Sequence, residues 1–236
     1  DMRRVGNLRM NIAYTLQFAE GTGSNASTTA RGGNFSSGIL GNFIAAGIPN
    51  MRISNVLDYD SRHNIVTSLD YRYGKGEGRI NGKPILENTG VNFIFRARSG
   101  EPYTKFRQPT RTNNLIDGGI NGSRLGWHFG LDMRLDRDID MNKLFSGKSI
   151  SEAKRPVMLN AFVLIQNLLN IKDILAVDGF TGRPDDDGYM ASPQGQLDIQ
   201  TQVNPQSFVD YYNMTLWNHN NINFPRRINV GLQLNF

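Results

Sequence analysis

The sequence contains no cysteine in its 236 residues. This absence excludes disulfide-stapled scaffolds, zinc sites with thiolate ligands, iron–sulfur centres and cysteine nucleophiles. The 3 histidines, His63, His128 and His219, are too far apart for the short spacings that metal sites use. We therefore expect no cofactor and no transition-metal chemistry.

Long apolar runs are also missing. Hydrophobic residues make up 39% of the chain and the mean hydropathy is -0.42, and no run approaches the ~18 to 20 apolar residues of a membrane-spanning helix. This excludes a helical membrane protein. It leaves a membrane β-barrel open, because every second residue of such a barrel can be polar.

Charge of one sign is not concentrated anywhere in the chain. The 26 Lys and Arg residues against 21 Asp and Glu residues give a net charge of +5 that is spread over the whole length. A nucleic-acid-binding surface gathers its basic residues on one face or stripe. We therefore expect no nucleic-acid partner.

Motifs for catalysis are absent as well. No Gly-x-Ser-x-Gly elbow occurs, and the glycine-rich stretch 74–78 lacks the spacing of a phosphate-binding loop. His128 and Asp132 share one face of a predicted strand but lie ~13 Å apart along it. We predict that the protein is not an enzyme and has no catalytic or cofactor-binding residues.

The feature that is present throughout is an alternation of apolar and polar residues. In residues 8–18 every second residue is apolar, a period that predicts a long strand rather than a helix. The same pattern recurs in residues 64–73, 91–98, 127–136, 157–168 and 228–236. Residues 157–168 are apolar on nearly both faces, so a buried helix fits their period too, but Val, Phe and Ile favour a strand.

The length of these segments and their aromatic residues favour a membrane barrel over a soluble sheet. Strands of about nine to eleven residues are long for globular proteins and match an oblique bilayer crossing. Aromatic residues that would form interfacial girdles lie near the strand ends. They are Phe18, Tyr71, Tyr73, Phe93, Trp127 and Phe236.

The connections alternate in length as a barrel requires. Residues 19–63, 99–126 and 169–226 form long connections, whereas 74–90 and 137–156 are shorter. Outer-membrane barrels have long external loops and short periplasmic turns. We therefore place the long loops outside the cell and the C-terminus in the periplasm.

Six strands cannot close a barrel, because the smallest membrane barrels have about eight and an open edge in hydrocarbon costs several kcal/mol per unpaired group. Further weak strand candidates are Leu197 to Val203 and Ile39 to Ile48. The predicted fold is all-β: residues 1–236 form the last six to eight or so strands of a larger antiparallel transmembrane β-barrel, whose plug and N-terminal strands are absent from this chain. The alternative is an autonomous barrel of about eight strands.

Several stretches resemble the C-terminal region of Bacteroidota TonB-dependent receptors of the Oar-like or SusC-like kind, and the resemblance covers residues 7–236. Its most specific pieces are Phe162-Val163-Leu164-Ile165-Gln166-Asn167-Leu168-Leu169-Asn170, Gly182-Arg183-Pro184-Asp185-Asp186-Asp187-Gly188-Tyr189 and Phe224-Pro225-Arg226-Arg227.

The resemblance implies an outer-membrane transporter of about 22 strands that encloses a plug and imports a ligand with energy from the TonB complex. Its implied partners are outer-membrane lipid, lipopolysaccharide, the remaining strands and plug, the TonB complex, the barrel assembly machinery and a surface lipoprotein lid. The alternative function is a non-transporting barrel, either a structural or adhesion scaffold or a component of a secretion machine.

Two sets of residues are candidates for roles in such a barrel. Charged residues on the polar sides of the third and fourth segments are predicted to line the lumen; they are Arg96, Arg98, Asp132 and Arg134. The alternating end of the chain resembles the signal that the assembly machinery recognises by strand addition. That signal comprises Val230, Leu232, Leu234 and Phe236.

The loops contain two further candidates. Asp185, Asp186 and Asp187 offer hard oxygen ligands to Ca²⁺ but lack the spacing of an EF-hand, so we assign no metal site there and keep loop solvation as the alternative. Loop arginines could bind lipopolysaccharide phosphates, or could be ordinary surface charge. They are Arg52, Arg62, Arg107, Arg111, Arg124 and Arg183.

Overall fold

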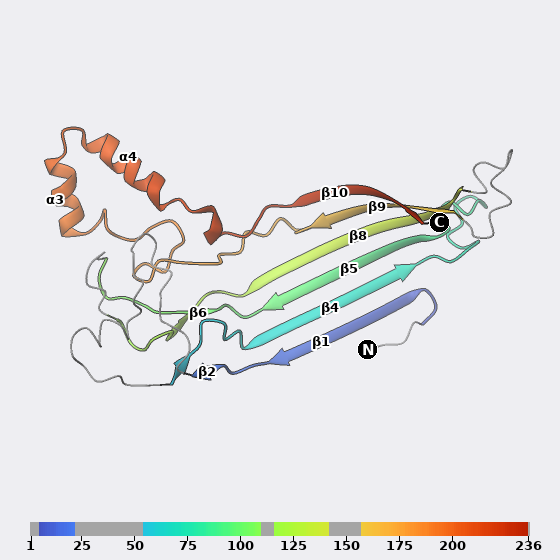
Figure 1. The fold of residues 1–236 in the computed structure, drawn as a ribbon, viewed down its shortest axis with the longest axis horizontal. Helices are drawn as coiled ribbons and strands as arrows, with labels where there is room; N and C mark the ends of the chain where they lie inside the picture. The colour runs from blue at the N-terminus through green and yellow to red at the C-terminus, as the bar shows by residue number, and fades with distance from the viewer. Residues whose placement is uncertain (1–4, 22–53, 110–115, 142–156, 236) are drawn as a thin grey trace.

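A computed structural model gives the fold and describes residues 5–21, 54–109, 116–141 and 157–235. Its main feature is a six-stranded antiparallel sheet whose long strands lie side by side in chain order (Figure 1). The strands are β1 (Leu8–Leu16), β4 (His63–Arg72), β5 (Thr89–Arg98), β8 (His128–Asp140), β9 (Met158–Gln166) and β10 (Arg227–Asn235). All six predicted strands are confirmed, including the fifth, for which the sequence also permitted a helix.

The short elements gather at one end of this sheet, which we call the loop end; the opposite end is the turn end. The loop end carries the paired strands β2 (Glu20–Gly21) and β3 (Asn55–Val56) and the paired strands β6 (Pro102–Tyr103) and β7 (Ser123–Arg124). It also carries α3 (Pro193–Thr201), α4 (Pro205–Leu216) and the 3-10 helix η1 (His219–Asn221). Figure 1 shows the helices at this end and the C-terminus at the other, so the described parts of the three long connections lie at one end of the sheet, as predicted.

The two α-helices make the fold mostly β rather than all-β. The strand predicted for Leu197 to Val203 is wrong over most of its length, because Leu197 to Thr201 belong to α3. The Ser192 hydroxyl accepts a hydrogen bond from the Gly195 N–H and a proline opens the first turn, a combination that starts helices. Residues 39–48 lie outside the described residues.

No helix in the described ranges has the length and the apolar character to cross a membrane. The sheet formed by the described residues is open rather than closed into a barrel, with β1 and β10 as its two edges.

The strand register brings most of the apolar residues of the six strands onto one face, which we call the apolar face. One row of directly paired residues on this face is Ile12, Thr67, Phe95 and Leu131. A second row is Leu135, Val163 and Val230. Because side chains alternate between the faces of a strand, the residues between these positions form the opposite, polar face.

The apolar face has no cover in the described part of the chain. Leu232 is 71% exposed, Val230 77% and Ile12 55%, and Leu131 is not buried either. The buried apolar side chains of the described residues are few and lie mostly at the loop end. They are Leu57, Ala97, Phe106, Tyr212 and Leu216. The sheet therefore does not build a core of its own.

Candidate functional site on the polar face and the loop end

The predicted polar wall contains one direct ion pair. Arg96 and Asp132 lie on the polar faces of the neighbouring strands β5 and β8, with Arg96 Nη1 2.5 Å from Asp132 Oδ2. The other oxygen of Asp132 accepts the Asn167 N–H at 2.9 Å. This carboxylate therefore joins the wall to the end of β9.

The other two predicted wall residues turn to different partners. Arg98 Nη2 lies 2.7 Å from Glu101, whose second oxygen lies 3.1 Å from His128 Nε2. Arg134 lies over the Phe162 ring at 4.6 Å. The structure thus places all four predicted residues on the polar side but brings only Arg96 and Asp132 together.

A second charged cluster lies nearer the turn end and was not singled out from the sequence. Arg72 binds Asp136 at 2.7 Å and Asp138 at 3.2 Å, and the Asn160 amide donates to Asp138 at 2.7 Å. These four residues belong to β4, β8 and β9 and cross the sheet over an intervening strand. The sequence signal for this cluster was the spacing of Asp136 and Asp138, which places both carboxylates on one face of β8. Their partner Arg72 lies two strands away, so it can be identified only when the strand register is known.

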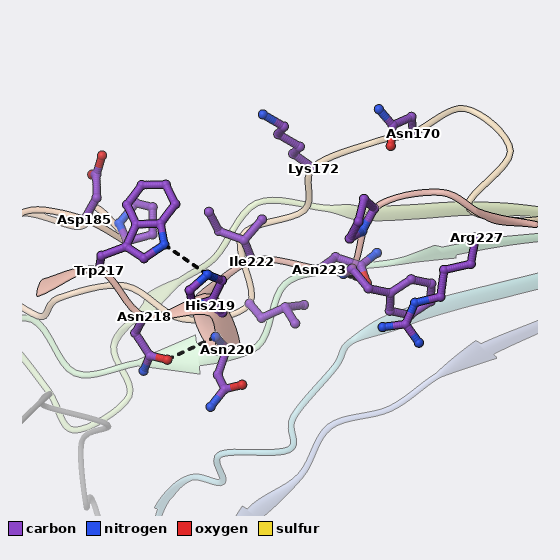
Figure 2. Close-up of a pocket in the computed structure, with 14 residues that line it drawn as sticks. Asn170, Lys172, Asp185, Trp217, Asn218, His219, Asn220, Ile222, Asn223 and Arg227 are labelled. Atoms are coloured by element: carbon purple, nitrogen blue, oxygen red, sulfur yellow. Dashed lines mark hydrogen bonds between the residues drawn. The ribbon is translucent and has the colours of Figure 1, made fainter. Parts of the chain in front are cut away.

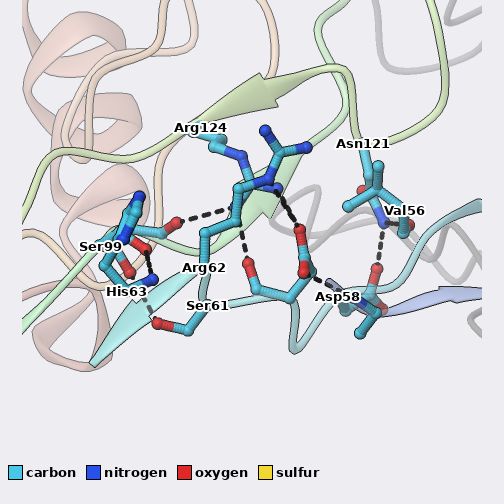
Figure 3. A network of polar contacts seen from close by, with 11 residues as sticks. Val56, Asp58, Ser61, Arg62, His63, Ser99, Asn121 and Arg124 are labelled. Atoms are coloured by element: carbon cyan, nitrogen blue, oxygen red, sulfur yellow. Dashed lines mark hydrogen bonds and ion pairs between the residues drawn. The ribbon is translucent and has the colours of Figure 1, made fainter. Parts of the chain in front are cut away.

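At the loop end, Asp60 is the centre of a buried polar clamp, part of which Figure 3 shows. It is 1% exposed, accepts the Ala19 N–H at 2.8 Å and binds the Arg124 guanidinium. Burial alone would raise the pKa of the Asp60 carboxyl, but these hydrogen bonds and the charges of Arg124 and Arg62 outweigh burial and lower that pKa. The carboxylate therefore stabilises the loop contacts in its charged form.

Asn121, close to Arg124 in the sequence, extends the clamp to Thr104. Its amide donates to the Val56 carbonyl at 2.8 Å and to Asp58 at 2.6 Å, and its own N–H donates to Thr104 at 2.9 Å (Figure 3). The first two long connections are thereby fastened to each other by buried polar groups, with Thr104 and Asn121 both at most 5% exposed. Polar groups so deeply buried are stabilising only when their hydrogen bonds are made, which fixes the relative position of the loops.

The loop arginines that we considered for phosphate contacts are paired inside the loops. Arg124 and Arg62 share Asp60, Arg107 lies 3.5 Å from Asp117, and Arg183 lies 3.6 Å from Asp185 and from Asp186. Arg52 and Arg111 lie outside the described residues. The described arginines therefore serve first to hold their own loops.

The three adjacent aspartates do not form a shared ligand set. Asp185 and Asp186 pair with Arg183, whereas Asp187 accepts the Tyr212 hydroxyl at 2.6 Å and the Tyr189 N–H at 3.0 Å. Within the described ranges no group of at least 3 His, Asp or Glu side chains could hold a metal ion. Asp187 thus attaches this loop to α4, whereas Asp185 and Asp186 pair within the loop.

The predicted assembly strand is β10, which forms an edge of the sheet and pairs with β9 along its other side. Val230, Leu232 and Leu234 lie on the apolar face and are exposed. Phe236 lies outside the described residues.

Aromatic side chains line the apolar face at the loop end. Tyr14, His63, Trp127 and Phe129 form one stacked row, with neighbouring ring centroids 6.1, 5.8 and 6.2 Å apart. The Tyr14 hydroxyl and His63 Nδ1 share a hydrogen bond of 2.9 Å. Only Trp127 of this row was predicted as an interfacial aromatic.

The turn end of the same face has its own aromatic pair. Tyr71 and Tyr73 meet edge to face with centroids 5.1 Å apart. Phe93, which we also predicted near a strand end, pairs with Leu69 and Met133 well inside the sheet. The aromatic rings with a polar group thus lie at both ends of the apolar face, whereas Phe93 and Phe95 lie between them.

Comparison of the chain with protein-family models, curated proteins and solved structures finds no match. The indications of function lie in the sheet, its two faces and its loop end.

Proposed function

We propose that this chain is the C-terminal part of an outer-membrane β-barrel, a TonB-dependent transporter that takes up a ligand across the outer membrane. The observation that carries the proposal is an uncovered apolar face that continues in register over six antiparallel strands, with aromatic rows at both ends. Such a face is what a lipid-facing barrel wall needs.

The dimensions of the sheet fit a bilayer. β4 has 10 residues, which at ~3.4 Å per residue give a strand of ~34 Å, and a tilt of ~40° projects this length to ~26 Å. An outer-membrane barrel has an apolar band of about 25 Å between its aromatic girdles. His63 of the loop-end aromatic row and Tyr73 of the turn-end pair are ten residues apart in the sequence, so they bound a band of about this height.

The position of Arg137 on the apolar face supports the placement of this face in a bilayer. Arg137 lies on this face opposite Thr89 and Ala161, beyond the level of Tyr71 toward the turn end. A long cationic side chain there reaches the head groups, whereas at mid-membrane it would be costly.

The open edges support a longer chain of strands. β1 and β10 each leave one side unpaired in the described sheet, and unpaired backbone groups cost several kcal/mol each in hydrocarbon. Further strands pairing with β1 and β10 would satisfy both edges and enclose the polar face with its Arg96–Asp132 pair.

A single introduced cysteine gives a direct test of the lipid-facing assignment, because these 236 residues contain none and any cysteine elsewhere in the protein can be replaced by serine. We expect Leu232→Cys, labelled with an environment-sensitive fluorophore in the full-length protein, to be quenched by brominated lipid and to resist a membrane-impermeant thiol reagent. Gln233→Cys, the adjacent residue on the other face, should show the opposite behaviour. Equal responses from both positions, in lipid vesicles in which the protein is folded, would refute the assignment.

Transport needs a separate test because a barrel can also be a scaffold. We expect at least one solute whose uptake falls both when this protein is deleted and when the TonB complex is deleted. If solute uptake is unchanged in the first deletion, the non-transporting alternative replaces the transporter.

A further inference from the structure

A pocket of about 730 Å³ lies between the end of β9, the end of α4 and the start of β10. Figure 2 shows Trp217 and His219 at one end of this pocket and Arg227 at the other. Its apolar lining is formed by Leu175, Pro184, Trp217, Ile222, Phe224 and Pro225. The polar groups around this lining decide what the pocket can accept.

The frame of the pocket is held by backbone pairing and by buried asparagines. Ile174 and Ile222 form an isolated β-bridge between the two chain segments that cross the pocket. Asn221, 4% exposed, donates to the Pro184 carbonyl at 2.8 Å, and Asn167, also 4% exposed, donates to the Phe224 carbonyl at 3.0 Å. Buried hydrogen bonds of this kind fix the positions of the lining residues before any ligand binds.

In three asparagines at the rim, the side-chain oxygen accepts a hydrogen bond from the protein, whereas the side-chain NH₂ group remains available to a ligand. The side-chain oxygen accepts a backbone N–H at 3.0 Å in Asn170, at 3.0 Å in Asn218 and at 2.8 Å in Asn223. Each side-chain NH₂ group has no protein partner within the described residues. Since an amide carries one oxygen and two N–H donors, these side chains can offer a ligand mainly donors.

The His219 ring also offers a hydrogen-bond donor to the pocket, because one of its nitrogens already accepts a bond from the protein. The Trp217 indole N–H lies 3.4 Å from His219 Nε2 and can only donate. Nε2 is then the acceptor, so the neutral ring carries its proton on Nδ1. The imidazole therefore also has an N–H to give.

Two cations complete the set. Lys172 and Arg227 line the pocket, and neither has a carboxylate partner in the part of the chain that the structure describes. Arg227 lies 4.6 Å above the Phe224 ring, which leaves its N–H edge available. The one acidic side chain at the rim, Asp185, already lies 3.6 Å from Arg183.

We propose that this pocket binds a ligand with one or more oxyanion groups, carboxylate or phosphate, joined to an apolar portion. The oxyanions meet the amide and cationic donors, and the apolar portion lies on Trp217 and Ile222. Charge-assisted hydrogen bonds from such donors are the strong ones, and a mostly apolar concave site with a few convergent polar groups is what small-molecule sites have in common.

The first test is calorimetric titration of the full-length protein with citrate, with pyrophosphate and with neutral glycerol. We expect citrate or pyrophosphate to bind, glycerol not to bind, and the affinity to fall as salt is added. Preference for citrate identifies a carboxylate ligand and preference for pyrophosphate a phosphate ligand. No binding of either anion, or glycerol binding as tightly as the anions, would overturn the proposal.

The second test compares two matched substitutions. Asn218→Asp keeps the acceptor that caps η1 but replaces the NH₂ donor by a charged oxygen, and should weaken anion binding about tenfold or more. Asn204→Asp makes the same change at the cap of α4, outside the pocket lining, and should leave affinity unchanged. Lys172→Gln with Arg227→Gln should weaken binding by a similar factor. Equal affinity in the wild type and all three variants would show that the anion binds elsewhere.

This inference does not depend on membrane insertion. If the protein binds anions but fails the lipid-quenching test, the pocket proposal holds and the barrel proposal is refuted. If the sheet faces lipid but no anion binds, the barrel proposal holds and the pocket proposal is refuted.

Discussion

Leu131→Arg tests the physical basis of the proposed function. Leu131 pairs with Phe95, which pairs with Thr67 and then with Ile12, and this row lies midway along β1 and β4. If the apolar face contacts lipid, the new guanidinium enters the centre of the bilayer, where Arg costs ~2 to 4 kcal/mol in a barrel. That range corresponds to a loss of about 30-fold to 1,000-fold in the folding equilibrium constant.

The neighbouring residue provides a matched control. Gly130 lies on the polar face of the same strand, and a Cβ added there would meet no atom within 4 Å. Gly130→Arg therefore adds the same side chain on the wet side, where we expect a change below about 1 kcal/mol. Urea unfolding of both variants in lipid vesicles, followed by tryptophan fluorescence, measures the difference. Equal stability of the two variants would refute the lipid-facing assignment of β8.

Three further perturbations address the polar face and the clamp. Arg72→Met should destabilise the fold by about 1 to 3 kcal/mol, because it removes the nearer of the two cations beside the 7% exposed Asp136 side chain, and adding Asp136→Leu should recover part of the loss in urea unfolding. Gly231→Ala should cost about 1 to 3 kcal/mol because the Phe162 ring covers that glycine, and Phe162→Ala should remove most of the cost in a double-mutant cycle. The depressed pKa of Asp60 means that its stabilising contribution is complete above the ordinary Asp value of ~3.9 and is lost as the pH falls through the folded-state value. Hydrogen exchange of the Ala19 amide, corrected for the intrinsic rate, should show protection decreasing below pH ~4 in the wild type and no such dependence in Asp60→Asn.

The six long strands were predictable because each repeats the period of a strand over a whole segment. The alternation from Leu8 to Leu16 fits no helical period, so the sequence alone decides β1. Register follows from the same alternation, since a slip of one residue would turn Leu232 and its neighbours onto the polar face. The order of the strands required only that consecutive strands be neighbours in space.

The helices and the clamp were not predictable from periodicity. The apolar residues of α3, such as Leu197 and Ile199, follow a spacing of two that also suits a strand, and the Ser192–Pro193 start signal decides the outcome. The clamp joins Asp60 to Arg124 and Asn121 to Val56, pairs separated by 64 and 65 residues. Local sequence patterns carry no information on contacts of that separation.

The candidate wall was half predictable for a related reason. Alternation assigns Arg96 and Asp132 to one face, but which partner each charge takes depends on the stagger between strands and on the loops beyond them. Arg98 was expected in the wall. Its guanidinium instead pairs with Glu101, which follows β5 closely and lies at the loop end. Asp136 and Asp138 face the same way as Asp132 and, through Arg72 and Asn160, make the denser cluster.

The choice between lipid and protein as the cover of the apolar face can be argued from the distribution of side chains on it. A protein cover would form a dry interface, in which the charge-depleted, aromatic-rich core lies at the centre and the polar rim surrounds it. Here the tryptophan and tyrosine residues stand at the two ends, with Trp127 and Tyr14 at the loop end and Tyr71 at the turn end. Most of the side chains between them carry no polar group; they include Phe93 and Phe95 beside Leu69 and Leu131. Amphipathic rings at two levels with mostly apolar side chains between them follow the polarity profile of a bilayer, and this arrangement favours lipid as the cover.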